Sequence, residues 1–257
     1  MRRRLDIEMV RRRIVESRTA AARAIREGQV LVAGTVEPKP ATLVESSTPV
    51  RIVDAGPRYV SRGGIKLEAA IREFEITVEE RRAIDVGAST GGFTHCLLEH
   101  GARSVVAVDV GYGQLHLRLR NDPRVTVVER TNIRHADPLF LGAPFGLVAA
   151  DVSFISLRTI ARVLVELGNG DSDYILLIKP QFEAGRGSVN HRGVVRDPLT
   201  RKQAVADTVA GLAESGLGVV GTVPSPIKGA NGNREVLGLF RHGPSLIDPV
   251  RAGEATR

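Results

Sequence analysis

The sequence has a single cysteine, few lysines and no long apolar run. With Cys96 alone, the chain can form neither an intramolecular disulfide nor a thiolate metal cluster. Apolar stretches such as 174–178 are far shorter than the roughly 18–20 residues that span a bilayer. The basic residues after Met1 run into a charged segment, not into the apolar core of a signal peptide. These absences predict a soluble, cytoplasmic protein.

The charge of the chain is unevenly distributed. Residues 1–62 hold 13 basic and 7 acidic side chains, a balance of +6, whereas the remainder of the 257 residues carries only +1. A solvated basic face is the simpler interpretation, and an electrostatic footprint for nucleic acid is the alternative. With 42% hydrophobic and 25% charged residues, the chain is expected to fold around a packed core.

The pattern of residues 1–57 predicts two short helices followed by strands. Asp6 can cap a first helix, which has Met9, Val10 and Ile14 on its inner side. Ser17 can cap a second helix, which ends at Gly28. Strands are expected at 30–32 and 50–53. The order Arg4-Leu5-Asp6, Ser17-Arg18, Ala21-Ala22, Gly28-x-Val30-x-Val32-x-Gly34 and Lys39-Pro40 resembles the S4 RNA-binding module.

The S4 resemblance, together with the basic charge, implies RNA contacts from arginines. The candidates are Arg4, Arg11, Arg12, Arg18, Arg23 and Arg62. Residues 54–62 combine turn-forming and polar residues. We therefore expect an RNA-binding domain over 1–57, a linker over 58–62, a larger domain over 63–243 and a disordered tail over 244–257.

The larger domain alternates short apolar strands with helices. Strands are expected at 82–86, 104–109, 125–129, 147–151, 174–179, 217–223 and 235–240. Helices are expected at 92–100, 156–167 and 199–215. This alternation predicts an α/β fold with a mostly parallel, Rossmann-like sheet covered on both faces. Asn231-Gly232 between the last two strands is a hairpin signal, and it predicts an antiparallel edge strand.

The first strand of this domain ends in a glycine-rich turn. The turn is Asp85-Val-Gly87-Ala-Ser-Thr-Gly91-Gly92, and Asp109 ends the next strand. Such a turn lets backbone approach a ligand, and an acid about 20 residues later can accept both ribose hydroxyls. Tight helix–strand packing is the alternative use of the glycines. The motif is similar to motif I of class I methyltransferases, which bind S-adenosylmethionine.

Four polar residues form a second candidate constellation. Asp151 and Lys179 end apolar strands, Glu235 opens the last strand, and Lys66 follows the linker. Among 36 basic residues only five are lysine, and lysine, unlike arginine, can give up its proton. Lys179 is therefore a candidate base. The alternative is a lysine paired with Asp151 for stability alone.

The motifs taken together resemble the TlyA family, an S4 module fused to an FtsJ-like ribose 2′-O-methyltransferase. The resemblance runs from Arg4 to Arg241 and rests on the following motifs: Ser61-Arg-Gly-Gly-Ile-Lys66-Leu, Asp85-Val-Gly-Ala-Ser-Thr-Gly-Gly-Phe-Thr94, Asp109-Val-Gly-Tyr-Gly-Gln-Leu115, Asn121-Asp-Pro-Arg-Val125, Asp151-Val-Ser-Phe-Ile-Ser-Leu157 and Lys179-Pro-Gln-Phe-Glu183. It implies methylation of cytidine in small- or large-subunit ribosomal RNA, with a catalytic tetrad of Lys66, Asp151, Lys179 and Glu235.

The resemblance also assigns a cofactor and its site. It implies S-adenosylmethionine held by Asp85, Gly87, Ser89, Thr90, Gly91, Gly92, Asp109, Asn132 and Asp151, with no metal. Tyr59 resembles the aromatic residue of a family linker that couples the two domains, although the family's Arg-x-x-Trp-like form is not clearly present. The Gly- and Arg-rich loop 181–197 is either a solvated loop or an RNA-facing flap.

Two other functions stay open at this point. The family has also been described as haemolysins, but the chain offers no spanning segment and no strongly apolar amphipathic helix for direct lysis. A small-molecule O-methyltransferase is the second alternative, and it would leave the basic module unexplained. Cys96 is expected to be a small core residue.

Overall fold

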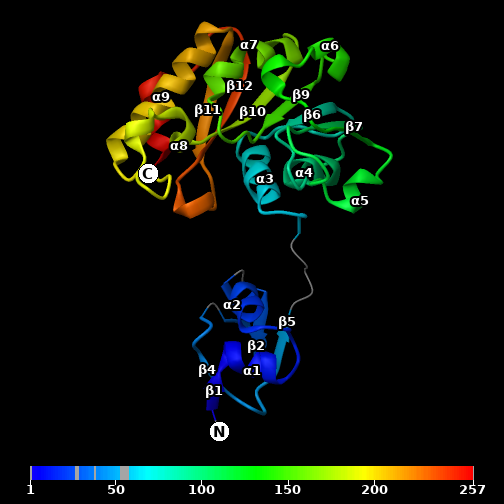
Figure 1. Cartoon of the computed structure of the whole chain (residues 1–257), viewed down its shortest axis with the longest axis vertical. Helices are drawn as coiled ribbons and strands as arrows, with labels where there is room; N and C mark the ends of the chain where they lie inside the picture. Colours follow the sequence, from blue (N-terminus) through cyan, green and yellow to red (C-terminus); the bar gives the residue numbers. More distant parts are fainter. Residues whose placement is uncertain (1, 27–28, 38, 53–57, 257) are drawn as a thin grey trace. The chain divides into compact units, whose positions relative to one another are not determined.

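The computed structural model describes residues 2–26, 29–37, 39–52 and 58–256. Its contacts divide the chain into two units, Met1–Arg58 and Tyr59–Arg257, each with its own core. Figure 1 shows both units coloured along the chain. Residues 53–57, at the end of the first predicted domain and just before the predicted linker, lie outside the described residues.

The smaller unit packs two helices against two small sheets. α1 (Leu5–Arg11) and α2 (Arg18–Arg26) accompany a pair of β1 (Arg2–Arg4) with β4 (Leu43–Glu45), and a sheet of β3 (Thr35–Val36), β2 (Val30–Val32) and β5 (Val50–Ile52). All of these pairs are antiparallel. The core gathers the apolar side chains of both helices and of the strands, chiefly Leu5, Met9, Ala21, Ala24, Ile25, Val30 and Val44.

The helix starts of this unit follow the predictions only in part. Ser17 accepts a hydrogen bond at Oγ from the Ala20 amide, which confirms it as the cap of α2. Asp6 is not the cap of α1, which begins one residue earlier. Its buried carboxylate is drawn instead into ion pairs with Arg4 and Arg18. Ile14 lies beyond the end of α1, and Gly28 and Val53 fall outside the described residues.

The larger unit is built on one seven-stranded sheet. Its order is β11-β12-β10-β9-β6-β7-β8, in which β12 runs opposite to all the other strands. The prediction of an antiparallel edge strand is wrong in its position, because β12 inserts between β10 and β11 and leaves β11 at the edge. The strands are β6 (Arg82–Val86), β7 (Ser104–Val108), β8 (Val125–Val128), β9 (Leu147–Ala150), β10 (Asp173–Ile178), β11 (Leu217–Pro224) and β12 (Val236–His242). Asn231 and Gly232 both have positive φ, as the dipeptide favours. They lie within a connection that runs from Pro224 to Val236, so they do not form a tight hairpin turn between β11 and β12.

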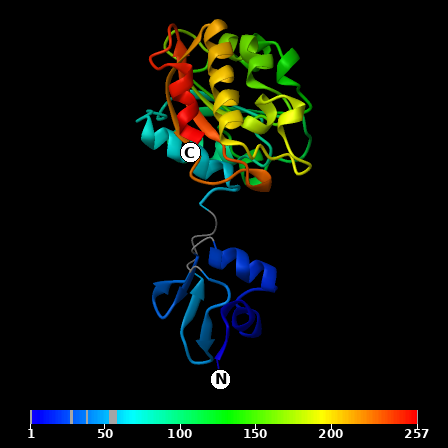
Figure 2. The ribbon, with the colours of Figure 1, turned by 90° about the vertical axis from the view of Figure 1, so that its left-hand side faces the viewer.

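Helices cover both faces of the sheet (Figures 1 and 2). Alternate strand residues point into two cores, because successive side chains of a strand face opposite ways. One core packs on α7 (Leu157–Leu167) and α9 (Pro198–Glu214), and the other on α3 (Gly63–Glu73) and α4 (Gly92–Glu99). The short helices are α5 (Leu117–Arg120), α6 (Pro138–Leu141), α8 (Pro180–Glu183) and the 3-10 turns η1 (Ile133–His135), η2 (Arg186–Ser188) and η3 (Ala230–Gly232).

Two boundary predictions are wrong. Tyr59 is not a linker residue, since its ring is buried in the core under α3, where Gly64 leaves it room. The C-terminal tail is not disordered over 249–256, where α10 (Pro249–Gly253) and η4 (Glu254–Thr256) pack on α9 and β11 (Figure 2). Ala252 is fully buried there. The segment is too short to show a helical period, so only its packing reveals it. Cys96 is buried in the core, as predicted.

Candidate functional site

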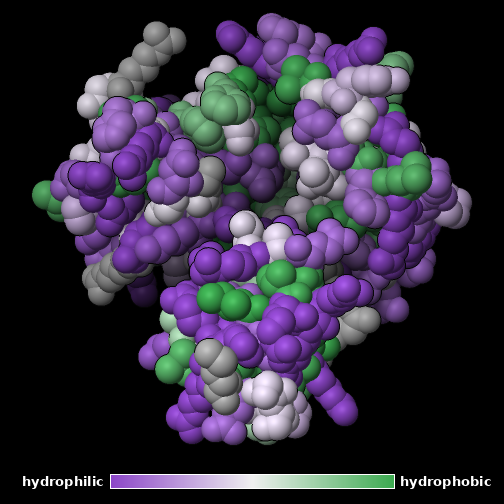
Figure 3. All heavy atoms as spheres, turned by 60° about the horizontal axis from the view of Figure 1, so that its bottom comes forward, coloured by the Kyte–Doolittle hydropathy of each residue, from purple (hydrophilic) through white to green (hydrophobic). Residues whose placement is uncertain are grey.

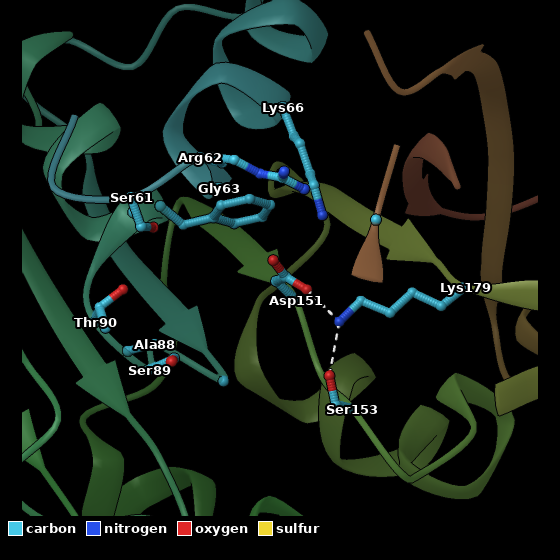
Figure 4. A pocket seen from close by; sticks show the side chains of 14 residues that line it. Ser61, Arg62, Gly63, Lys66, Ala88, Ser89, Thr90, Asp151, Ser153 and Lys179 are labelled. Carbon is cyan, nitrogen blue, oxygen red and sulfur yellow. Dashed lines mark hydrogen bonds and ion pairs between the residues drawn. The ribbon is translucent and has the colours of Figure 1, made fainter. Parts of the chain in front are cut away.

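The site lies where β6, β7, β9 and β10 end on one edge of the sheet. The parallel register brings Val86, Val108 and Ala150 level, and Ile178 ends the neighbouring strand. The loops that follow these strands enclose two adjoining cavities of about 210 and about 500 Å³. Both cavities are lined by Gly87, Ser89, Asp151 and Ser153. Figure 4 shows the smaller one from close by.

The glycines of the turn after β6 have different roles. Gly87 has φ 86°, and a Cβ there would lie 2.7 Å from the Asp151 carbonyl oxygen, so a side chain would clash with the backbone that follows β9. Gly91, at φ 97°, and Gly92 permit close packing, since a Cβ would lie 2.3 Å from Leu119 Cδ1 and 2.2 Å from Ser61 Oγ respectively. Gly91 is not among the lining residues of either cavity.

Asp85 lies beneath this turn and holds it from inside. Its buried carboxylate accepts hydrogen bonds at Oδ2 from the backbone amide (2.8 Å) and the hydroxyl (2.6 Å) of Thr94, in the first turn of α4. Burial, opposed by these hydrogen bonds, raises the pKa of Asp85 to about 7. Neither cavity is lined by Asp85. The prediction of Asp85 as a cofactor ligand is therefore wrong, because the strand alternation points it inward.

The larger cavity contains the predicted ribose acid. The Asp109 carboxylate accepts hydrogen bonds from the backbone amides of Ser89 (at Oδ2) and Gly111 (at Oδ1), both at 2.7 Å. These bonds fix the carboxylate in the cavity wall. Asn132 lies on the same wall and caps η1 by accepting a hydrogen bond from the Arg134 amide. Thr90 lines the smaller cavity instead.

The four residues of the predicted tetrad come together as two ion pairs. Lys179 Nζ lies 2.5 Å from Asp151 Oδ1, and Lys66 Nζ lies 2.6 Å from Glu235 Oε2. Figure 4 shows Lys66, from α3, and Lys179, after β10, pointing into the pocket from different elements. Glu235 is buried behind Lys66 and is not a lining residue, so it contacts the pocket through that lysine. Each ion pair fixes the position of its lysine at the pocket.

The structure adds residues that the sequence did not single out. Ser153 accepts a hydrogen bond from Lys179 Nζ at 2.9 Å, and Gln181 Nε2 lies 3.5 Å from Glu235 Oε1. Phe154, with φ 66°, is 91% exposed beside the site, and its ring lies 5.1 Å from that of Phe182. A polar residue two positions after a strand-ending acid was a visible signal for Ser153. The aromatic pair had no such signal, because a phenylalanine in a sequence usually indicates a core position.

Most of the predicted RNA-contacting arginines are tied to carboxylates within the smaller unit. Arg4 and Arg18 pair with Asp6, and Arg11 and Arg12 with Glu8, whose side chain is fully buried. Hydrogen bonds from Arg11 and Arg12 lower the pKa of Glu8 to about 2. Arg23 is exposed, whereas Arg62 donates a hydrogen bond to the Lys228 carbonyl and lines the smaller cavity of the larger unit. The surface in Figure 3 is predominantly hydrophilic.

The loop around 190–195 is held in place by asparagines. Asn233 donates a hydrogen bond to the Gly193 carbonyl, and Asn231 to the Arg192 carbonyl, both at 2.9 Å.

Within the described ranges no helix has the length and apolarity needed to cross a membrane. In the same ranges no three His, Cys, Asp or Glu side chains are grouped as metal ligands would be.

Comparison with known proteins gives the class to which this fold and site belong. Residues 59–241 match the FtsJ-like methyltransferase family, and residues 3–50 match the S4 domain. A 16S/23S rRNA (cytidine-2′-O)-methyltransferase TlyA of Mycobacterium tuberculosis is 48% identical over 91% of this chain and 88% of its own. Hemolysin A of Brachyspira hyodysenteriae is 41% identical over 88% and 94%. The chain belongs to the TlyA family of FtsJ-like methyltransferases.

A solved structure supports the same assignment. A protein from Streptococcus thermophilus, whose name also carries the word hemolysin, is 36% identical with a TM-score of 0.76 and covers 99% of this chain and 94% of its own. The family and the mostly parallel α/β fold predicted from the motifs are confirmed.

Proposed function

We propose that this chain is an S-adenosylmethionine-dependent 2′-O-methyltransferase of cytidine in ribosomal RNA. The observation that carries the proposal is the pair of adjoining cavities at the sheet edge. They share the wall formed by Gly87, Ser89, Asp151 and Ser153, and Lys179 lies beside that wall in the smaller cavity. One cavity can take a methyl donor and the other a ribose, with the base candidate at their junction.

The larger cavity suits the adenosyl part of the cofactor. Its volume of about 500 Å³ falls within the usual range for ligand pockets. Asp109 would accept the ribose hydroxyls, Asn132 would meet the adenine, and Gly87 leaves the backbone bare for close approach. Ser89 and Asp151 would border the methionine end. When bound, the cofactor supplies a methyl group activated by its sulfonium sulfur.

Lys179 is the residue best placed to act on the acceptor hydroxyl. A ribose hydroxyl becomes a good nucleophile only when its proton leaves, and Lys179 Nζ would take that proton from the oxygen. Asp151 holds Nζ at 2.5 Å and stabilises the ammonium that forms. Lys66, held by Glu235, places a second positive charge in the same cavity, where it would stabilise negative charge developing on the oxygen.

The acceptor side of the site is chemically suited to RNA. Arg62, Lys66 and Lys179 line the smaller cavity, and such cations attract a phosphodiester backbone. The exposed basic residues of the S4 domain add a second region of positive charge. The rRNA (cytidine-2′-O)-methyltransferase name of the Mycobacterium tuberculosis relative supports cytidine in ribosomal RNA as the substrate.

Lys179→Ala provides the direct test of this function. Wild-type protein, incubated with labelled S-adenosylmethionine and purified small or large ribosomal subunits, should yield 2′-O-methylcytidine after digestion to nucleosides. The variant should lose activity by ~10²–10⁴ while cofactor and RNA still bind, since it lacks the base and not a binding anchor. Full activity in the variant would refute the role of Lys179. Absence of methylated cytidine with wild-type protein would refute the proposed function.

A further inference from the structure

In the sequence, Ser153 stands between Asp151, the carboxylate of the predicted tetrad, and Phe154, which has a strained backbone conformation. It follows Asp151 by two positions and precedes Phe154, whose positive φ of 66° turns the chain sharply. Its hydroxyl accepts the hydrogen bond from Lys179 Nζ at 2.9 Å, as Figure 4 shows, and it lines both cavities. Strained backbone of this kind persists where the surrounding structure enforces it, often at functional sites.

We propose that Ser153 is a positioning residue that, together with Asp151, orients Lys179 toward the acceptor ribose. The inference rests on the proposed methyltransferase function. Lys179 Nζ lies 2.5 Å from Asp151 Oδ1 in an ion pair and donates a hydrogen bond to Ser153 Oγ at 2.9 Å. The ion pair fixes the distance of Nζ from the carboxylate, and the hydrogen bond to Ser153 supplies the direction.

This arrangement fixes where the proton goes. To act as a base Lys179 must present a lone pair to the ribose hydroxyl, and the hydrogen bond that Nζ donates to Ser153 restricts the directions in which this lone pair can point. The ribose proton then passes to that lone pair, forming the third N–H bond, while the oxygen keeps the electron pair of the broken O–H bond. Without the Ser153 hydroxyl the amine can rotate about the Cε–Nζ bond, and the lone pair is aligned for only part of the time.

The loop that carries Ser153 is fixed at both ends. At its start the Asp151 amide donates a hydrogen bond to the Val86 carbonyl. At its end the Glu183 carboxylate accepts hydrogen bonds from the Ser156 hydroxyl and the Leu157 amide. The hydroxyl of Ser153 is thus held in place. Around Lys179 the charged groups are Asp151, to which it is paired, and Lys66 and Arg62 across the same cavity.

Ser153→Ala tests this role, and Ser153→Thr is the rescue variant. Ser215→Ala is the matched control, because Ser215 is an exposed serine at the end of α9. We expect Ser153→Ala to slow single-turnover methylation of ribosomal subunits about tenfold, the value of one hydrogen bond. Cofactor and RNA affinities should change less than twofold. Ser153→Thr should restore most of the rate.

A second measurement does not depend on activity. The chain has five lysines, so the ammonium signal of Lys179 can be identified in ¹H–¹⁵N spectra by comparison with Lys179→Arg. Its hydrogen exchange should be slow in wild type and Ser215→Ala, and faster in Ser153→Ala. An active wild type with unchanged rate and exchange in Ser153→Ala would overturn the inference alone. A wild type that methylates no ribosomal RNA would overturn the proposed function and this role with it.

Discussion

Asp85 shows how a single buried group can make the stability of the fold depend on pH. The neutral form of its carboxyl is favoured by burial, which raises its pKa from 3.8 to about 7. The stabilisation that this raised pKa gives the folded state is fully present below the pKa that Asp85 has in the unfolded chain. It is lost as pH rises through about 7. The free energy of unfolding should therefore fall between pH 4 and 7 on account of this residue.

Asp85→Asn should remove that part of the pH dependence, because an amide keeps an acceptor for Thr94 but does not ionise. At 1.36 kcal/mol per pKa unit, the contribution of Asp85 is on the order of 4 kcal/mol. Urea unfolding at several pH values between 4 and 8 measures it. The difference in unfolding free energy between variant and wild type should move in favour of the variant as pH rises. Parallel profiles would show that Asp85 does not titrate in this range.

At the scale of elements, α10 determines how the edge of the sheet is covered. Ala252 is fully buried against α9 and β11, whereas Val250 on the same helix is 73% exposed. The Thr222 hydroxyl donates a hydrogen bond to the Ala252 carbonyl, which ties the helix to β11. A Cβ at Gly253 would lie 2.6 Å from the Lys202 carbonyl oxygen, so the helix approaches the α9 backbone closely.

Ala252→Asp should lower the free energy of unfolding by roughly 1–3 kcal/mol, because it places a carboxylate where none can be solvated without undocking the helix. Val250→Asp is the matched control and should stay within about 0.5 kcal/mol of wild type. Denaturant unfolding followed by circular dichroism measures both. Equal effects of the two variants would mean that α10 is not docked in solution.

At the scale of the whole molecule, the two units have separate cores and separate chemistry. The glycine turn, Asp109 and both ion pairs belong to Tyr59–Arg257, whereas the clustered arginines belong to Met1–Arg58. Tyr59 packs within the larger unit, where the Val60 amide donates a hydrogen bond to His95 Nδ1. A chain that begins at residue 58 would keep these contacts.

Removal of residues 1–57 should leave S-adenosylmethionine affinity within about twofold and weaken binding to ribosomal RNA. Each phosphate contact that is lost should reduce the log–log salt slope by roughly 0.7–0.9. Calorimetry measures the first effect and filter binding over a salt series the second. An unchanged slope would show that the arginines of the smaller unit do not contact RNA.

The sequence by itself determined the elements and the chemical groups of this protein. Apolar strands, the Gly87 turn, Asp109 and the tetrad are local patterns, because strand alternation, turn glycines and strand-ending polar residues act over a few positions. Tertiary structure alone decided which groups meet. The Lys66–Glu235 pair joins residues 169 apart, and Ser153, after β9, meets Lys179, after β10. Asp85 turns toward Thr94 in α4 and away from the cavities. Such contacts depend on how distant elements pack, and packing is a property of the whole fold.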